Sequence, residues 1–374
     1  MKAIQMVDLT TQYQRIQAEI DRAALDVIRS GRYINGEAVG KLAAGLSAYT
    51  GSEYVIPCAN GTDALRIALA ALDLQPGDEV IVPAFLYVAA AEAAVLLRLI
   101  PVAVDVHPRT FNIDVNRIEE AISPKTKAII PVHLFGQTAD MEPLMQIARR
   151  HGLFVIEDNA QSIGSVYTFS NGIQKQAGTI GDIGILSFFP TKNLGCYGDG
   201  GALTTNDKAL AEKLRMMTIH GQSQKYVHQI VGCNSRLDTL HAAVLLVKSA
   251  YLDDYIHSRR KLASWYNAGL KLLNDLFETP YCIPESSHVY NQYTLIVKEN
   301  RDGLQQYLKE KGIPTTVYYP LPLHLQPAFK KRVRIAGDLK TSEKLCRSVL
   351  SLPMHTEVDG EQAQYIINQL IRYE

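Results

Sequence analysis

The sequence predicts an α/β fold in which helices cover both faces of a mainly parallel β-sheet, giving a three-layer sandwich. Two observations predict this class. Short apolar runs alternate with amphipathic segments through residues 54–205, and each run is continuously apolar rather than alternating with polar residues. Strands that are buried on both faces of a parallel sheet show this pattern. The pattern changes near residue 245, which predicts a large domain over residues 1–245 and a smaller α+β domain over residues 246–374.

The apolar runs of the first part are the expected strands, and the amphipathic segments between them are the expected helices. The expected strands are Tyr54–Cys58, Glu79–Val82, Val102–Asp105, Ala128–Val132, Leu153–Ile156, Gly184–Phe188 and Ala202–Thr205. The expected helices are Asp63–Leu72, Ala89–Leu97, Val115–Ile122 and Met141–His151. Parallel sheets bind ligands at the carboxyl ends of their strands, so residues just beyond these ends should converge on one crevice.

The C-terminal part begins with a long helical stretch, Leu237–Leu273, and continues with the apolar runs Gln292–Val297 and Thr315–Tyr319. Helical patterns at Gly303–Lys311 and Gly360–Tyr373 flank these runs. This order of elements predicts the smaller α+β domain.

The composition excludes several classes of protein. Lys+Arg and Asp+Glu both number 38 in the 374 residues, so the net charge is zero, which argues against a nucleic-acid or anionic-membrane partner. The five cysteines form no CxxC pair and the histidines show no ligand spacing, so we expect reduced thiols, a cytoplasmic location and no metal. Glu92 and Arg98 interrupt the apolar stretch Val80–Val106, which favours buried elements over a membrane span.

A lysine in a glycine-rich loop is the most informative feature of the chain. Lys192 follows an apolar run, and the aromatic residues Phe188, Phe189 and Tyr197 lie near it in the sequence. A desolvated amine is neutral and nucleophilic near neutral pH. Asp158 ends an earlier run, and the two residues together indicate pyridoxal 5′-phosphate (PLP) carried on Lys192, with Asp158 pairing with the ring nitrogen. The simpler interpretations are a surface lysine and a helix-capping aspartate.

Other residues complete a predicted cofactor site. Gly61 and Thr62 precede a helix, whose first N–H groups suit the cofactor phosphate, and Ser187 would add a hydroxyl group. Gln161 lies one helical turn beyond Asp158 and is expected to bind the phenolic oxygen of the ring. Tyr87 is expected to stack on the ring. An ordinary capped helix start and an aromatic core residue are the alternatives for these positions.

Taken in order, these motifs resemble the DegT/StrS family of PLP-dependent sugar aminotransferases, which have the fold type I, aspartate aminotransferase-like architecture. The matching segments are Ala59–Leu65, Pro76–Val80, Pro131–Gly136, Glu157–Gln161, Ser187–Gly201, His220–Gly221, Asn234–Asp238 and Pro320–Gln326. The resemblance implies that Lys192 holds the cofactor covalently and then moves the proton between substrate and cofactor. It also implies a homodimer, because an asparagine of the partner subunit, here Asn234, reaches the phosphate in this family.

The resemblance also suggests substrate residues. Arg236 is a candidate for binding a carboxylate of glutamate or of the sugar, with a subunit-interface ion pair as the alternative. His220, His324 and Tyr319 are candidates for binding the sugar or its phosphates. Packing at the domain interface is the alternative for these three residues.

The implied reaction is transfer of an amino group from L-glutamate to a keto sugar of a nucleotide-diphosphate sugar, for amino-sugar or polysaccharide biosynthesis. The segment from Lys192 to Asp199 (KNLGCYGD) resembles family members that aminate C3, whereas members that aminate C4 more often read Lys-x-Ile-Thr-Thr. One alternative is a PLP-dependent sugar dehydratase, but its known relatives carry histidine in place of Lys192. The other is a PLP- or sugar-binding regulator without turnover, which would be expected to lack Lys192, Asp158 or Gln161.

Overall fold

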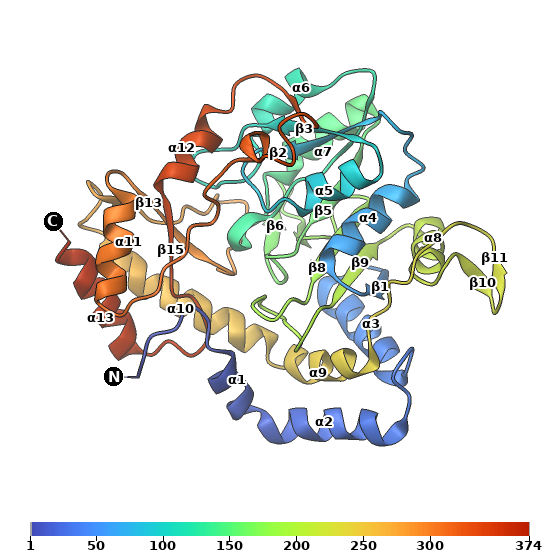
Figure 1. The fold of residues 1–374 in the computed structure, drawn as a ribbon, viewed down its shortest axis with the longest axis horizontal. Coiled ribbons are helices and arrows are strands. Elements are labelled where there is room, and N and C mark those ends of the chain that lie inside the picture. Colours follow the sequence, from blue (N-terminus) through green and yellow to red (C-terminus); the bar gives the residue numbers. More distant parts are fainter. Residues whose placement is uncertain (1, 374) are drawn as a thin grey trace.

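The computed structural model describes residues 2–373 and is built around an eight-stranded sheet of order β1-β9-β8-β5-β4-β2-β3-β14 (Figure 1). Its strands are β1 (Tyr54–Cys58), β2 (Glu79–Pro83), β3 (Ile100–Val104), β4 (Thr126–Ile129), β5 (Phe154–Asp158), β8 (Ile183–Ser187), β9 (Gly201–Thr205) and β14 (Arg334–Ile335). Neighbouring strands from β14 to β8 are parallel, while β9 is antiparallel to both β8 and β1. The expected mainly parallel sheet is confirmed.

Helices cover both faces of this sheet. They are α3 (Glu37–Thr50), α4 (Gly61–Ala71), α5 (Ala89–Leu96), α6 (Ile118–Ala121), α7 (Met141–His151) and α8 (Lys208–Thr218). The two helices before them are α1 (Leu9–Arg15) and α2 (Gln17–Ser30), and α2 packs against the helix over residues 239–249. Successive residues of β2 show the layering, because Val80 and Val82 join the core that contains α4 and α5, whereas Ile81 joins the core that contains α7. Side chains alternate between the two faces of a strand, so a strand with apolar residues on both faces needs a helical layer on each side.

The C-terminal part adds a three-stranded antiparallel sheet of order β12-β13-β15. Its elements are α9 (Thr239–Ser249), α10 (Leu252–Leu270), β12 (Phe277–Glu278), β13 (Tyr293–Val297), α11 (Arg301–Glu310), α12 (Lys340–Ser348), β15 (Val349–Leu352) and α13 (Gly360–Ile371). The short elements of the chain are η1 (Val115–Arg117), η2 (Leu134–Gly136), β6 (Val166–Thr168), β7 (Gln174–Gln176), β10 (Gln222–Gln224), β11 (Val227–His228) and η3 (Leu323–Leu325). The hairpin β10–β11 projects from the body of the large part (Figure 1).

Several expected elements differ in detail. The helical stretch Leu237–Leu273 is two helices, since α9 ends at Ser249 and α10 begins at Leu252. The expected helix Val115–Ile122 is a 3-10 turn followed by the single turn of α6. The run Thr315–Tyr319 forms no strand and pairs only through an isolated bridge from Thr316 to Ser351. Proline precedes and follows this run in the sequence, and proline cannot donate a ladder hydrogen bond.

The two parts are interlocked along the chain. Helix α9 crosses residue 245, and β14, from the C-terminal part, extends the large sheet by pairing with β3. The division at residue 245 stays a prediction. Among residues 2–373, no helix is long and apolar enough to cross a membrane, and no cluster of His, Cys, Asp and Glu could hold a metal ion.

Candidate active site

The predicted cofactor residues begin at two adjacent strand ends. Strands β5 and β8 are parallel neighbours, with Asp158 paired to Ile185, so Asp158 and Ser187 lie at the same edge of the sheet. The loop after Ser187 then folds back on itself. Phe188 N–H donates to Gly200 O (2.8 Å), Cys196 N–H to Phe188 O (2.8 Å) and Lys192 N–H to Phe189 O (2.9 Å). These bonds fix the backbone from which the Lys192 side chain extends.

Lys192 and Asp158 lie close enough to influence each other's ionisation. Burial lowers the pKa of Lys192 from 10.5 to about 8, while the charge of Asp158 opposes this shift. Burial raises the pKa of Asp158, while a hydrogen bond from Ala160 N–H (3.1 Å) and the charge of Lys192 oppose that shift. Among residues 2–373, the Asp158 carboxylate accepts no other hydrogen bond, so it keeps capacity for a cationic partner such as a protonated pyridine.

A close approach of Gly61 to Ser187 forms the predicted phosphate site. A Cβ atom at Gly61 would lie 3.0 Å from Ser187 Cβ and 3.3 Å from its Oγ. The Asn60 side chain caps α4 by accepting a hydrogen bond from Asp63 N–H (2.8 Å), which leaves the earlier N–H groups of the helix available. Thr62 lies in this first turn. Free N–H groups at a helix N-terminus beside a serine hydroxyl suit a phosphate group.

Gln161 and Tyr87 meet through a residue of the C-terminal part. The Gln161 side-chain oxygen accepts a hydrogen bond from Phe135 N–H (2.7 Å), and its amide nitrogen donates to the Tyr319 hydroxyl (3.3 Å). The Tyr319 ring lies 6.2 Å from that of Tyr87, which is 61% exposed. Tyr87 is therefore accessible to solvent, and its stacking on the cofactor ring stays a prediction.

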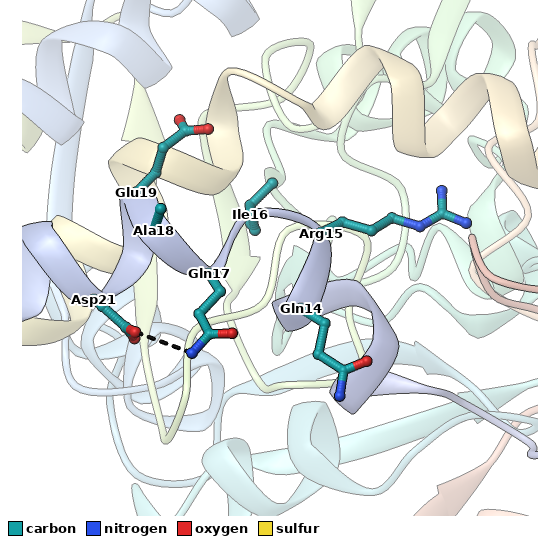
Figure 2. Close-up of a pocket in the computed structure, with 7 residues that line it drawn as sticks. All are labelled: Gln14, Arg15, Ile16, Gln17, Ala18, Glu19 and Asp21. Atoms are coloured by element: carbon teal, nitrogen blue, oxygen red, sulfur yellow. Dashed lines mark hydrogen bonds between the residues drawn. The ribbon is translucent and has the colours of Figure 1, made fainter.

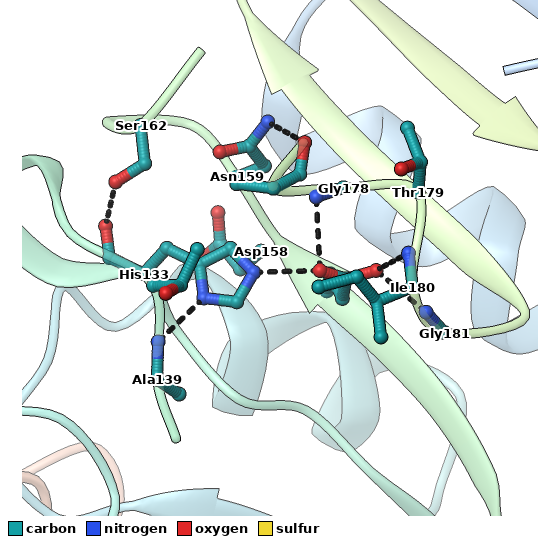
Figure 3. Close-up of polar contacts among 12 residues, drawn as sticks. His133, Ala139, Asp158, Asn159, Ser162, Gly178, Thr179, Ile180 and Gly181 are labelled. Carbon is teal, nitrogen blue, oxygen red and sulfur yellow. Dashed lines mark hydrogen bonds and ion pairs between the residues drawn. The ribbon is translucent and has the colours of Figure 1, made fainter. Parts of the chain in front are cut away.

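A buried hydrogen bond between His133 and Glu157 supports the strand that carries Asp158 (Figure 3). His133 Nε2 lies 2.8 Å from Glu157 Oε2, and both side chains are fully buried. His133 Nδ1 accepts a hydrogen bond from Ala139 N–H (3.0 Å), which assigns the proton to Nε2 and the donor role to that nitrogen. The Glu157 carboxylate also accepts from the N–H groups of Gly178, Ile180 and Gly181. This pair was not predicted from the sequence. Its only signal there is a second carboxylate, Glu157, next to Asp158 in an otherwise apolar strand.

The residues proposed to serve a second subunit lie beside the phosphate site of their own chain. Ala59 N–H donates to the Ser235 hydroxyl (3.2 Å), which places residues 234–236 against the turn before α4. Asn234 is exposed, and the Arg236 Nε is buried with no hydrogen-bond partner. His220 is exposed, with φ of 63°, at the base of the β10–β11 hairpin.

His324 differs from the other candidates. Its Nε2 lies 3.1 Å from Glu343 Oε1 on α12, while its Nδ1 is buried without a hydrogen-bond partner. No hydrogen bond joins it to Lys192, Asp158 or Gln161 within residues 2–373. The structure therefore pairs His324 with Glu343 and shows no hydrogen bond from it to these three cofactor residues.

A separate hollow of about 470 Å³ lies at the bend between α1 and α2 (Figure 2). Its lining residues are Gln14, Arg15, Ile16, Gln17, Ala18, Glu19 and Asp21. None of them is a candidate site residue, and the hollow is open to solvent.

Comparison with known proteins identifies the family. The model of the DegT/DnrJ/EryC1/StrS aminotransferase family matches residues 14–371. The chain belongs to this family. It is 48% identical to "Pleiotropic regulatory protein" of Geobacillus stearothermophilus, over 99% of this chain and 98% of that protein. It is 46% identical to "UDP-2-acetamido-2-deoxy-3-oxo-D-glucuronate aminotransferase" of Pseudomonas aeruginosa, over 97% of this chain and 98% of that enzyme.

Solved structures of this aminotransferase family share the fold. An enzyme from Brucella abortus superposes with a TM-score of 0.94 at 42% identity, covering 99% of both chains. The structure of NtdA from Bacillus subtilis with bound pyridoxamine phosphate superposes with a TM-score of 0.87 at 35% identity, covering 95% of this chain and 81% of that one. The protein is thus a fold type I aminotransferase with PLP as its cofactor. The desolvated Lys192, the Asp158 carboxylate and the cradle at Gly61 and Ser187 fit that cofactor.

Proposed function

We propose that this aminotransferase moves the amino group of L-glutamate to the C3 keto group of a nucleotide-diphosphate sugar, for amino-sugar or polysaccharide biosynthesis. The observation that carries the proposal is that Asp158, at the end of β5, and Lys192, in the loop after the neighbouring strand β8, lie near enough for each charge to affect the pKa of the other. The KNLGCYGD segment and the similarity to the glucuronate aminotransferase support C3 as the position of amination.

Each site residue has a definite role in this proposal. When bound, PLP supplies the electron sink that makes the substrate C–H bond acidic. Lys192 would hold the cofactor covalently, and its free amine would move a proton between the substrate carbon and the cofactor in each half of the reaction. Asp158 keeps the ring nitrogen protonated, and Gln161 donates to the phenolic oxygen. Gly61, Thr62 and Ser187 bind the phosphate.

We further propose that two copies of the chain share their active sites, with Asn234 of one subunit reaching the phosphate bound by the other. Two apolar side chains, Tyr226 in the projecting hairpin and Val231 in the segment after it, support a surface that a second copy covers, because they are 80% and 92% exposed in the single chain. The unpartnered Arg236 is proposed to bind a carboxylate of glutamate or of the sugar. His220 and His324 are proposed to bind the sugar or its phosphates.

Two other functions are disfavoured. A sugar dehydratase on this scaffold would be expected to lack Lys192. A regulator without turnover is suggested by the names of some relatives, the Geobacillus protein among them, but such a protein would not need Lys192, Asp158 and Gln161 to stay together. The balanced charge of the chain also offers no basic segment for nucleic acid.

The test is mass spectrometry of the products formed from glutamate and a panel of dTDP- and UDP-linked 3-keto and 4-keto sugars. We expect an amino sugar from a 3-keto substrate, together with 2-oxoglutarate. Amination of 4-keto sugars alone would overturn the assignment to C3. Loss of sugar oxygen without gain of nitrogen would indicate a dehydratase, and absence of any glutamate turnover would favour the regulator.

A further inference from the structure

Tyr319 lies in a segment that is held by both parts of the molecule. At one end, Thr316 exchanges backbone hydrogen bonds with Ser351 of β15 in the small sheet (3.2 and 2.8 Å). At the other end, Leu323 N–H donates to Ala84 O (2.9 Å), just beyond β2 of the large sheet. Tyr319 therefore extends from a strap, residues 316–323, whose two ends are anchored to different sheets.

The direction of the hydrogen bonds leaves the Tyr319 proton free. A backbone N–H can only donate, so the bond from Phe135 fixes the Gln161 side-chain oxygen on that side and turns the amide nitrogen toward Tyr319. The Tyr319 oxygen is then an acceptor in its bond with Gln161. Within residues 2–373, no hydrogen bond uses the Tyr319 O–H as a donor, so one donor remains for a ligand.

The surroundings of this hydroxyl favour a neutral partner. Burial raises the pKa of Tyr319, and the nearby charge of Asp158 raises it further, so the group stays a phenol. The same negative charge disfavours a carboxylate of glutamate at this position. The buried ring of Phe85 and the exposed ring of Tyr87 lie 5.9 and 6.2 Å from that of Tyr319, so the hydroxyl group has an aromatic rather than a charged surrounding on these sides.

We propose that the Tyr319 hydroxyl donates a hydrogen bond to a hydroxyl oxygen on the sugar ring of the acceptor, an oxygen that the amino-sugar product retains. Tyr319 is then a specificity-determining residue for the sugar half of the reaction. The inference rests on the proposed function and deepens it. Glutamate, which is recognised through its carboxylates, does not need this donor.

The experiment compares the wild-type holoenzyme with Tyr319→Phe, which removes only the hydroxyl group, and with Tyr318→Phe as the matched control. Calorimetry measures binding of the amino-sugar product, and stopped-flow absorbance measures the glutamate half-reaction. For Tyr319→Phe we expect sugar binding to weaken by about tenfold, the loss of one good hydrogen bond. The glutamate half-reaction and the affinity for PLP should stay within about twofold of wild type, as should all properties of Tyr318→Phe.

Unchanged sugar binding in Tyr319→Phe would overturn the inference. So would equal slowing of both half-reactions with a shifted pH midpoint of the cofactor absorption band, because Tyr319 would then act on the cofactor through Gln161. Failure of the proposed function is a separate result, seen when the wild-type enzyme neither aminates nor binds any nucleotide sugar of the panel.

Discussion

The Lys192 amine and the Asp158 carboxylate each stabilise the charged form of the other, while burial opposes both charges. A desolvated amine with a pKa of about 8 is partly neutral at physiological pH and can attack an aldehyde. The carboxylate, with its single hydrogen bond from Ala160, is ready to pair with a cationic ring. The site thus places a nucleophilic amine and a carboxylate that can pair with the cofactor ring nitrogen at one edge of the sheet.

Capture of PLP by the cofactor-free enzyme should depend on pH in a way that follows Lys192. The neutral amine is the nucleophile, so the rate should rise with pH and level off above about pH 8. The Asp158 charge raises the pKa of Lys192, and Asp158→Asn should therefore move the midpoint to lower pH. Stopped-flow absorbance across pH measures both curves. A midpoint that stays near the usual 10.5 of a lysine would contradict the desolvated site.

Gly61→Ala should weaken binding of PLP by about tenfold or more, because the added Cβ would lie 3.0 Å from Ser187 Cβ inside the phosphate site. Titration of the cofactor-free protein with PLP gives the dissociation constant. Gly45→Ala on α3 is the matched control, since nothing lies within 4 Å of its added Cβ. Equal affinity in both variants would remove Gly61 from the phosphate site.

Sequence patterns were sufficient for the parallel sheet and for the positions of Asp158, Ser187 and Lys192, because continuous apolar runs mark buried strands and polar residues mark their ends. They could not reveal contacts that depend on packing between distant segments. The Gln161–Tyr319 hydrogen bond joins residues 158 positions apart, and the strap that carries Tyr319 looks like a strand in sequence. Nothing in the sequence distinguishes His324, which lies with Glu343, from a substrate ligand.

Glu157→Gln should destabilise the fold by about 2–4 kcal/mol, because an amide cannot accept hydrogen bonds with both ends and would leave a buried donor unpaired. The carboxylate receives four donors, from His133, Gly178, Ile180 and Gly181. Denaturant unfolding of the cofactor-free protein measures the change. Glu53→Gln, at an exposed position, serves as the control. Equal stability of the two variants would show that the hydrogen bonds of Glu157 do not stabilise the fold.

Mixing two inactive variants should restore activity if subunits share their sites. In a hybrid dimer of Lys192→Ala and Asn234→Ala, one site combines the intact lysine of one chain with the intact asparagine of the other. Random reassociation after mild denaturation should recover about a quarter of the wild-type activity. Each variant treated alone gives the baseline. Recovery at the baseline level would mean that Asn234 serves its own chain.

The central claim is that Lys192 carries the cofactor and performs the transfer. The direct measurement is borohydride reduction of the PLP-loaded enzyme, proteolysis and mass spectrometry of the labelled peptide. Lys248 serves as the comparison within the same chain, because burial also lowers its pKa to about 8 and an amine with this pKa can also react with PLP. We predict a single label on Lys192, its loss after addition of glutamate before reduction, and no label in Lys192→Ala. A label on Lys248, or normal turnover in Lys192→Ala, would contradict the account.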